Sequence, residues 1–275
     1  MSKAKASQTN SGVTLDRCIV ADPVRMPDLR HGLRALSQRA KRSVRRLYDV
    51  SRWLDRQQLA AIYLRGEGLE IGALHSPLKV PHSARVRYVD RLPLAELRRQ
   101  YPELASAHLV DIDIVDDGEK LSTVGAGTQE FVIANHFIEH CEDPIGAIGN
   151  FVRVLRKGGV LYLAVPDKRY TFDIDRPVTP VEHMVKDHTD GPAWSRLGHF
   201  EEWVRCVDKI TGEAESRQRL AHLLELNYSI HFHVFTQAEL LGLVLEMPRR
   251  FGFPIELEIF LKSQRENVLI LRKTA

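Results

Sequence analysis

The sequence predicts an α/β fold built on a mostly parallel sheet, and two features of residues 129–167 carry this prediction. Residues 131–134 and 160–165 are almost unbroken apolar runs, as in strands that are covered on both faces. The segment between them predicts an amphipathic helix, because its apolar residues gather on one face: Ile145, Ile148, Phe151, Val152 and Leu155. Two strands joined by one helix form a parallel crossover unit. Ligands bind beyond the carboxyl ends of such strands, so we expect the chemistry at residues 135–140 and 167–169.

The other elements follow the same patterns along the chain. Helices are predicted at about residues 52–64 and 94–101, and a later helix should begin at the capping box formed by Thr236 and Glu239. Prolines between the first two strands exclude a regular helix of normal length there. The remaining strands are expected, in order, at residues 68–71, 85–89, 109–114, 255–261 and 267–271.

Length and charge divide the chain into two predicted parts. We expect a basic, partly disordered extension at residues 1–50 and a main domain at residues 51–275, which carries an insertion at about residues 168–230. Residues 1–52 hold twelve Lys or Arg against four Asp or Glu. An Arg-rich helix at residues 27–47 would suit either a solvated position beside the domain or contact with an anionic surface.

Composition excludes several classes of protein. The three cysteines are far apart and form no CxxC pair, which indicates neither a disulfide framework nor a cysteine zinc site. No apolar run approaches the length needed to span a bilayer, so we expect a cytoplasmic protein. The main body is acidic and lacks a stacking-aromatic motif, and therefore we expect no nucleic-acid partner.

Five short motifs resemble, in register, those of class I S-adenosylmethionine-dependent methyltransferases. They are LEIG, YVD, DDGEKL, EFVIANHFIEHCEDP and LRKGGVLYLAVPD, and they cover about residues 66–167. The closest resemblance is to the branch with a Leu-Glu-His-like triplet after the fourth strand, here Ile138, Glu139 and His140. The resemblance implies a Rossmann-like, mostly parallel sheet with a terminal antiparallel hairpin, and S-adenosyl-L-methionine as the cofactor.

The resemblance also implies the cofactor-binding residues. Glu70, Gly72 and the adjacent Ala73 match the loop around the methionine end of the cofactor, and Asp90 matches the acid that holds the ribose hydroxyls. The positions that match the adenine side and the methionyl side are, in that order, Asp117, Gly118, Asn135 and His136. Only one of the family's three loop glycines is present, and the absence of GxGxxG argues against a nicotinamide enzyme.

Catalysis at an acceptor oxygen calls for a group that removes a proton, and a histidine suits this task best. We expect the base among His183, His231, Asp167 and His140, the first two being favoured because they lie in or next to the insertion. Loops at the carboxyl edge carry substrate choice, and the charged residues there predict these substrate contacts: Arg169, Asp173, Arg176 and His188.

A metal site in the insertion is the less favoured interpretation. His183, Asp187 and His188 fall within one or two helical turns of each other, with Glu182 adjacent. A helix whose polar side faces solvent accounts for the same pattern. We therefore expect no metal ligand.

The sequence as a whole predicts a methyltransferase that acts on an oxygen of a hydroxyl-rich or glycan-related substrate. Two alternatives remain open. One is a methyltransferase of a small natural product or lipid, which would need a deep apolar pocket under the insertion. The other is a non-catalytic scaffold with the methyltransferase fold, for which the reduced glycine loop is the sign.

Overall fold

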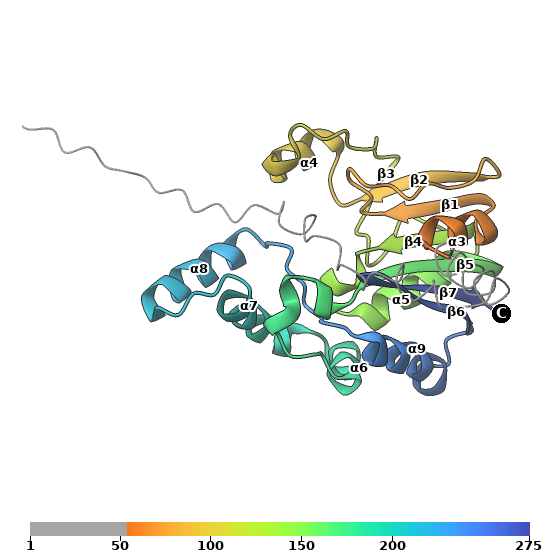
Figure 1. Cartoon of the computed structure of the whole chain (residues 1–275). Coiled ribbons are helices and arrows are strands. Elements are labelled where there is room, and N and C mark those ends of the chain that lie inside the picture. The colour runs from red at the N-terminus through yellow and green to blue at the C-terminus, as the bar shows by residue number, and fades with distance from the viewer. Residues whose placement is uncertain (1–53) are drawn as a thin grey trace, which may run out of the picture.

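One mixed sheet of seven strands forms the centre of the protein (Figure 1). This computed structural model describes residues 54–275, and the predicted basic extension and its helix at residues 27–47 lie outside the described residues. The strand order is β3-β2-β1-β4-β5-β7-β6, and β7 runs antiparallel to both of its neighbours. The strands are β1 (Gly66–Ile71), β2 (Ala84–Asp90), β3 (Ile114–Val115), β4 (Gln129–Asn135), β5 (Leu155–Pro166), β6 (Ile255–Ser263) and β7 (Glu266–Lys273). The predicted α/β class, the parallel sheet and the terminal hairpin are confirmed.

The strand β1 lies at the switch point of the sheet: β2 and β3 follow it on one side, and β4 and β5 follow on the other. It pairs in parallel with both of its neighbours, β2 and β4. Gly68, for example, lies opposite Phe131 of β4. A point where the chain leaves a central strand in two directions opens a crevice at the carboxyl edge. The ends of β1 and β4 therefore define where a ligand would enter this sheet.

Helices cover both faces of the sheet (Figure 1). On one face, α5 (Pro144–Val154) and α9 (Gln237–Phe251) bury apolar residues such as Ile148 and Leu243 against the strands. On the other face, α3 (Arg56–Tyr63) contributes Leu59 to a second core with Phe131. Strands packed on both faces have to be apolar throughout, which explains the unbroken runs in β4 and β5.

The helix α9 begins where the capping box predicts. Glu239 accepts a hydrogen bond from the backbone nitrogen of Thr236 at 2.9 Å, and the Thr236 hydroxyl accepts one from the backbone nitrogen of Ala238 at 3.3 Å. Amide groups in the first turn of a helix have no partner inside the helix, so these side chains satisfy them.

Loss of this cap should lower the stability of the folded protein measurably. Thr236→Ala should lower the free energy of unfolding by about 1 kcal/mol, because the first turn loses its side-chain acceptor. Thermal unfolding followed by circular dichroism measures the effect, with Thr236→Ser as the control that keeps the hydroxyl. Equal melting temperatures for the parent and Thr236→Ala would contradict the assigned cap.

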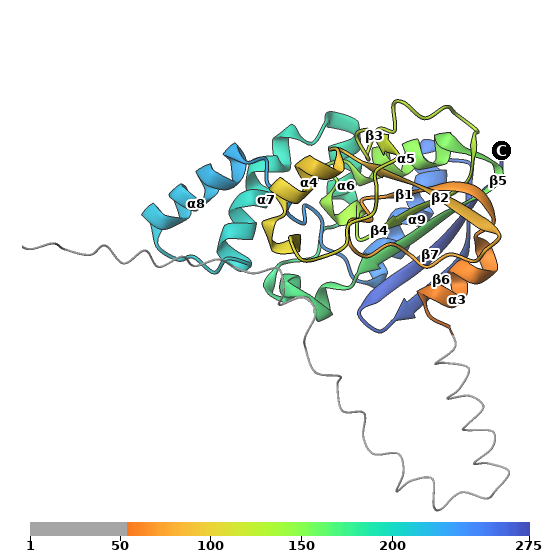
Figure 2. The ribbon, with the colours of Figure 1, turned by 90° about the horizontal axis from the view of Figure 1, so that it is seen from above.

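The insertion between β5 and α9 forms its own layer at the carboxyl edge. It contains α6 (Val181–Asp190), α7 (Ala193–Cys206) and α8 (Glu213–Glu225), of which α7 and α8 extend away from the sheet (Figures 1 and 2). The insertion has a small core of buried residues: Phe200, Trp203, Val204, Leu223, Ile230 and Phe232. These side chains hold α7, α8 and the following extended segment, residues 230–235, together.

At the edge of the sheet two predictions agree with the structure and one does not. The helix α4 (Leu94–Gln100) is found where predicted, and no regular helix joins β1 to β2. The prediction of a third strand at residues 109–114 is wrong. The strand β3 comprises only Ile114–Val115, so it shares one residue with the predicted range. Val110 instead donates a backbone hydrogen bond to Leu74 in the loop after β1, at 2.9 Å. None of the helices among residues 54–275 has the length and hydropathy that crossing a bilayer requires.

Candidate functional site

The ends of three neighbouring strands bring the predicted cofactor residues to one edge of the sheet. Asp90 is the last residue of β2, Asn135 is the last of β4, and Gly72 directly follows β1 between them. Gly72 has a positive φ of 64°, a conformation that glycine adopts without strain. The edge at which the strand order predicts a crevice is therefore bordered by residues that the sequence singles out.

Glu70 presents a buried carboxyl group at this crevice. The residue is 1% exposed, and its Oε1 accepts a hydrogen bond from the backbone nitrogen of Leu78 at 2.9 Å. Its Oε2 has no hydrogen-bond partner among residues 54–275. Burial raises the pKa of Glu70 to about 7, although the Leu78 hydrogen bond acts in the opposite direction. The Oε2 atom is thus a buried acceptor that a cationic group or a hydrogen-bond donor of a ligand could bind.

Asp90 lies at the end of β2 in a similar setting. It is 8% exposed, and its Oδ1 accepts a hydrogen bond from the backbone nitrogen of Arg91 at 2.7 Å. Burial raises the pKa of Asp90, and the hydrogen bond from Arg91 offsets part of that rise.

Phe137 fills the space between the loop after β1 and the turn after β3. A Cβ atom on Gly118 would lie 2.7 Å from the Phe137 Cζ atom and 2.7 Å from the Ile71 Cγ2 atom, which is too close for any side chain. Gly118 is therefore required for close packing behind the crevice. Gly72 is less crowded, since its Cβ would lie 3.4 Å from the Phe137 ring.

Two other predicted cofactor residues lie at the rim. The Asp117 carboxylate accepts hydrogen bonds from Lys120 Nζ at 2.7 Å and from the backbone nitrogen of Glu119 at 3.0 Å. Its side chain is 45% exposed, so a ligand donor can displace the lysine. Ala73 is half-buried beside Gly72 and leaves the backbone of the loop accessible.

Asn135 and His136 complete the crevice on the β4 side. The Oδ1 atom of Asn135 is buried and has no hydrogen-bond partner among the described residues. His136 has a positive φ of 50°, and its Nε2 lies 2.8 Å from Glu266 Oε2. Burial by itself would lower the pKa of His136, but the carboxylates of Glu266 and Glu139 raise it. An orphaned amide oxygen next to a left-handed residue indicates a ligand-binding turn.

Among the predicted bases, His231 has the geometry of an oriented imidazole. Its Nδ1 lies 2.7 Å from Asp173 Oδ2, and both side chains are buried. Because an ionised carboxylate can only accept, the proton lies on Nδ1 and leaves a lone pair on Nε2. Burial would raise the pKa of Asp173, but His231 and Arg176 hold it below its usual range. The pair fixes the tautomer that a general base requires.

Glu139 lies beside this pair, although it was named from the sequence only as a member of the resembling triplet. It is fully buried, and neither carboxyl oxygen has a hydrogen-bond partner among residues 54–275. Glu139, His140 and His231 each bring a polar atom within 4.8 Å of the others. Burial raises the pKa of Glu139, which favours the neutral acid as a hydrogen-bond donor.

The other two candidate bases are less suited to take a proton. His140 is half-buried, with Nδ1 3.0 Å from the carbonyl oxygen of Ile230, and burial lowers its pKa to about 3. Asp167 is buried and held by Arg169 Nε at 2.8 Å and by Lys262 Nζ at 3.3 Å. Burial opposes ionisation, yet Arg169 and Lys262 lower the pKa of Asp167. His140 packs beside His231, with ring centroids 4.6 Å apart, whereas Asp167 joins Arg169 to Lys262.

Two of the predicted substrate contacts, Arg176 and Asp173, are buried, and a third, His188, is partly exposed but bound to another side chain. Arg176 is 1% exposed, and its guanidinium binds Asp173 Oδ1 at 2.9 Å and Glu202 Oε1 at 2.8 Å. Asp173 is 2% exposed and is used by Arg176 and His231. His188 binds Asp143 Oδ2 at 2.9 Å and thereby ties α6 to the start of α5. These groups build the site, and of the four predicted contacts only Arg169 is half exposed.

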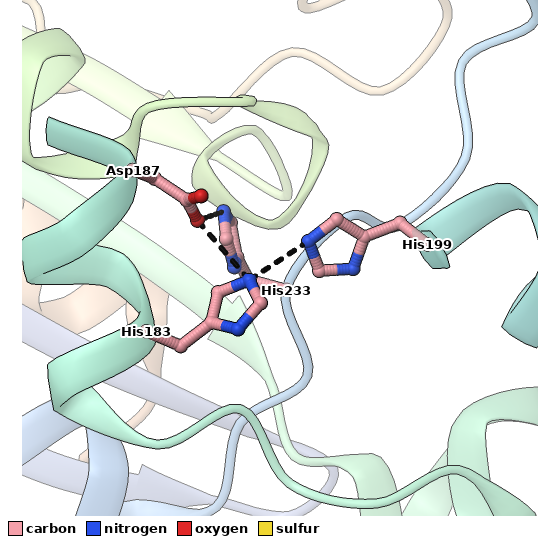
Figure 3. A group of neighbouring side chains, drawn as sticks. All are labelled: His183, Asp187, His199 and His233. Atoms are coloured by element: carbon pink, nitrogen blue, oxygen red, sulfur yellow. Dashed lines mark hydrogen bonds and ion pairs between the residues drawn. The ribbon is translucent and has the colours of Figure 1, made fainter. Parts of the chain in front are cut away.

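A second cluster of ionisable side chains lies within the insertion (Figure 3). It joins His183 and Asp187 of α6, His199 of α7 and His233 of the extended segment. The His183 Nε2 atom lies 3.1 Å from His199 Nε2 and 3.3 Å from Asp187 Oδ2. Burial lowers the pKa of His199 to about 4 and that of His233 well below its usual value, so both imidazoles are neutral at pH 7.

His231 and His233 lie two residues apart, and an extended strand would place them on the same side. Residues 230–235 form no strand, and the chain bends at His233. In the structure they join different clusters, because His231 reaches Asp173 whereas His233 lies 3.7 Å from Asp187. His199 was not predicted to lie beside His183, because nothing in the sequence around His199 shows which residues α7 contacts.

Two surface hollows lie away from this edge of the sheet. One is at the amino ends of the strands and is lined by residues that include Glu130, Arg156 and Arg272. The other lies within the insertion, between residues such as Asp208 and His222. Neither contains a residue of the crevice or of the two histidine clusters.

Comparisons with known proteins identify the family of this domain. Residues 33–250 match the protein family described as "Methyltransferase domain". No curated protein is similar enough in sequence to be matched. Solved structures with a similar fold include a putative S-adenosyl-L-methionine-dependent methyltransferase from Methanococcus maripaludis, with 14% identity, a TM-score of 0.40 and coverage of 77% of this chain and 79% of that one.

Two more solved structures extend the comparison. An arsenic(III) S-adenosylmethionine methyltransferase from Chlamydomonas reinhardtii is 13% identical, with a TM-score of 0.41 over 90% of this chain and 74% of that one. The CurJ carbon methyltransferase is 11% identical, with a TM-score of 0.41 over 78% of this chain. The alignment spans only 50% of the CurJ chain, about half of its length.

Proposed function

The chain belongs to the methyltransferase domain family, and we propose that it transfers the methyl group of S-adenosylmethionine to an oxygen of a hydroxyl-rich, glycan-related acceptor. The choice of an oxygen as the methyl acceptor rests on one observation, the buried Asp173–His231 pair. This pair lies where the insertion meets the carboxyl edge of the sheet. A hydroxyl group attacks carbon faster when a positioned base takes its proton.

The residues of the crevice fit the proposed cofactor. The unpartnered oxygens of Glu70 and Asn135 suit the ammonium group of the methionine end, and Asp90 suits two ribose hydroxyls. The half-exposed carboxylate of Asp117 suits the amino group of the adenine base. When bound, the cofactor supplies an electrophilic methyl group on a sulfonium ion.

In the proposed reaction the chain positions the acceptor and removes its proton. His231 Nε2 takes the hydroxyl proton while Asp173 stabilises the imidazolium that forms. Arg176 keeps Asp173 ionised and also donates to the backbone carbonyl of His231 at 2.7 Å, so it holds both members of the pair. Exclusion of water and alignment of the oxygen with the methyl group supply much of the acceleration.

The rim of the site supports a polar, hydroxyl-rich acceptor. Tyr170 is 44% exposed, and Lys262 Nζ lies 4.5 Å from its ring centroid and 3.3 Å from its hydroxyl group. Trp194, in the insertion, is 46% exposed, with Lys186 Nζ 4.1 Å from its ring. Exposed aromatic rings beside charged donors can stack on a sugar ring and bind its hydroxyls.

Labelled cofactor tests the acceptor class. The full chain should be incubated with S-adenosylmethionine that carries a labelled methyl group and with separate panels of glycans, lipids and small phenols. The proposal expects the label in the glycan panel, as an ether that survives mild base. Label found only in the lipid or phenol panel would favour the natural-product alternative.

The pKa of Glu70 makes cofactor binding depend on pH. With a pKa of about 7 in the free protein, Glu70 is protonated at pH 6 and ionised at pH 8. The ligand ammonium prefers the ionised form, so the affinity for S-adenosylmethionine should fall by up to about tenfold from pH 8 to pH 6. In Glu70→Gln this dependence should be lost, because the amide does not titrate in this range. Parallel pH profiles for the two proteins would show that Glu70 does not contact the cofactor.

A further inference from the structure

Four side chains from three separate parts of the insertion point at one small volume (Figure 3). His183 and Asp187 lie four residues apart on one face of α6, His199 comes from α7, and His233 comes from the segment before α9. One nitrogen or oxygen atom of each lies within 4.8 Å of all the others. Asp187 and His233 are buried, and His183 is partly exposed.

The hydrogen bonds within this group leave some of its buried polar atoms without a partner. His183 Nε2 carries at most one hydrogen, yet it faces both His199 Nε2 at 3.1 Å and Asp187 Oδ2 at 3.3 Å. Asp187 Oδ2 is buried and has no hydrogen-bond partner with good geometry among residues 54–275. An unsatisfied buried carboxylate oxygen that faces three imidazoles has a high desolvation cost. His233 Nε2 also lies 3.3 Å from the carbonyl oxygen of Glu142, a long contact that a bound cation would replace. A cation at the centre would then accept a lone pair from each of the four side chains.

We propose that His183, Asp187, His199 and His233 together bind one divalent transition-metal ion, for which zinc is the best match. Zinc takes nitrogen and carboxylate ligands in a tetrahedron with bonds of roughly 2.0–2.1 Å, which places the ligand atoms about 3.3 Å apart. Three contacts in the cluster measure 3.1, 3.3 and 3.7 Å. Imidazole ligands disfavour magnesium and calcium, which prefer oxygen.

A hydrogen bond outside the four ligands supports the assignment. Ser195 Oγ donates to Asp187 Oδ1 at 2.7 Å, which fixes the carboxylate with its other oxygen toward the imidazoles. Ligands of metal ions are commonly oriented by such partners. Ser195 lies on α7, so this bond also joins the two helices of the site.

The ion would have a structural role. Four protein ligands complete a tetrahedron and leave no position for a substrate. The ion fastens α6 and α7 to residues 230–235, the segment that carries His231 two residues before His233. The link to catalysis rests on the proposed function, whereas metal binding does not, and the test below measures binding alone.

The test uses the purified full-length chain, freed of metal by a chelator and then titrated with zinc chloride. We expect about one zinc ion per chain, measured by elemental analysis after gel filtration, and a higher melting temperature with zinc than without it. Asp187→Ala should abolish both effects, while His222→Ala, an exposed histidine on α8 of the same insertion, should retain them.

A milder variant covers the case in which Asp187→Ala does not fold. Ser195→Ala keeps all four ligands but loses the orienting hydrogen bond, and zinc affinity should fall about 10- to 100-fold. Magnesium chloride at the same concentration should leave the melting temperature unchanged. The proposal is overturned if the parent retains no more zinc than the Asp187 variant, or if Ser195→Ala and the parent bind zinc equally.

Discussion

Replacement of His231 by alanine is expected to slow methyl transfer by a factor of about 100 to 10,000 and to leave the affinity for S-adenosylmethionine unchanged. The reason is the orientation of the imidazole, whose Nδ1 is fixed by Asp173 at 2.7 Å so that Nε2 can accept a proton. Rates at saturating cofactor, with an acceptor found in the labelling assay, measure the effect.

The controls for this variant separate catalysis from folding. His231 packs against Phe172 and His140, with ring centroids 4.7 and 4.6 Å away, so the alanine variant needs a check by circular dichroism. His231→Gln fills most of the same space and should be as slow. His183→Ala, the other favoured candidate base, should retain more activity than either, because His183 has no carboxylate that fixes Nδ1. Parental turnover in both His231 variants would show that the base is another group or that none is needed.

The core of the fold was predictable because burial leaves a periodic trace in the sequence. Unbroken apolar runs identified β4 and β5, and the capping box at Thr236 placed the start of α9 within one residue. The third strand was misplaced because a buried loop can be as apolar as a buried strand. Leu109 and Val110 are buried and apolar, but they pack as a loop, and apolarity alone does not distinguish the two.

The place of the proposed cofactor site was partly predictable, because parallel strands bring their carboxyl ends together. Asp90, Asn135 and Gly72 were named from the motif resemblance, and the structure places them at the same edge of the sheet. Phe137 was not identified. Its contact with Gly118 joins the turn after β3 to the end of β4, which are neighbours only in the folded sheet.

The insertion was the least predictable part, because its charges are satisfied by residues far along the chain. Arg176 suggested a substrate contact in the sequence, yet Glu202 and the His231 carbonyl bury it. The helical spacing of His183 and Asp187 was visible in the sequence, but only the folded chain brings His199 and His233 beside them.

Calorimetric titration of the full chain with S-adenosylmethionine tests the central claim, that the cofactor binds between the ends of β1 and β4. We expect one site per chain and a binding loss of about 1.5 to 3 kcal/mol, roughly tenfold or more in affinity, in Asp90→Ala, since the ribose hydroxyls lose a charged acceptor. Asp190→Ala, an exposed carboxylate at the end of α6, should bind like the parent. No binding by the parent would favour the non-catalytic scaffold, and equal affinity of the parent and Asp90→Ala would contradict the assigned site.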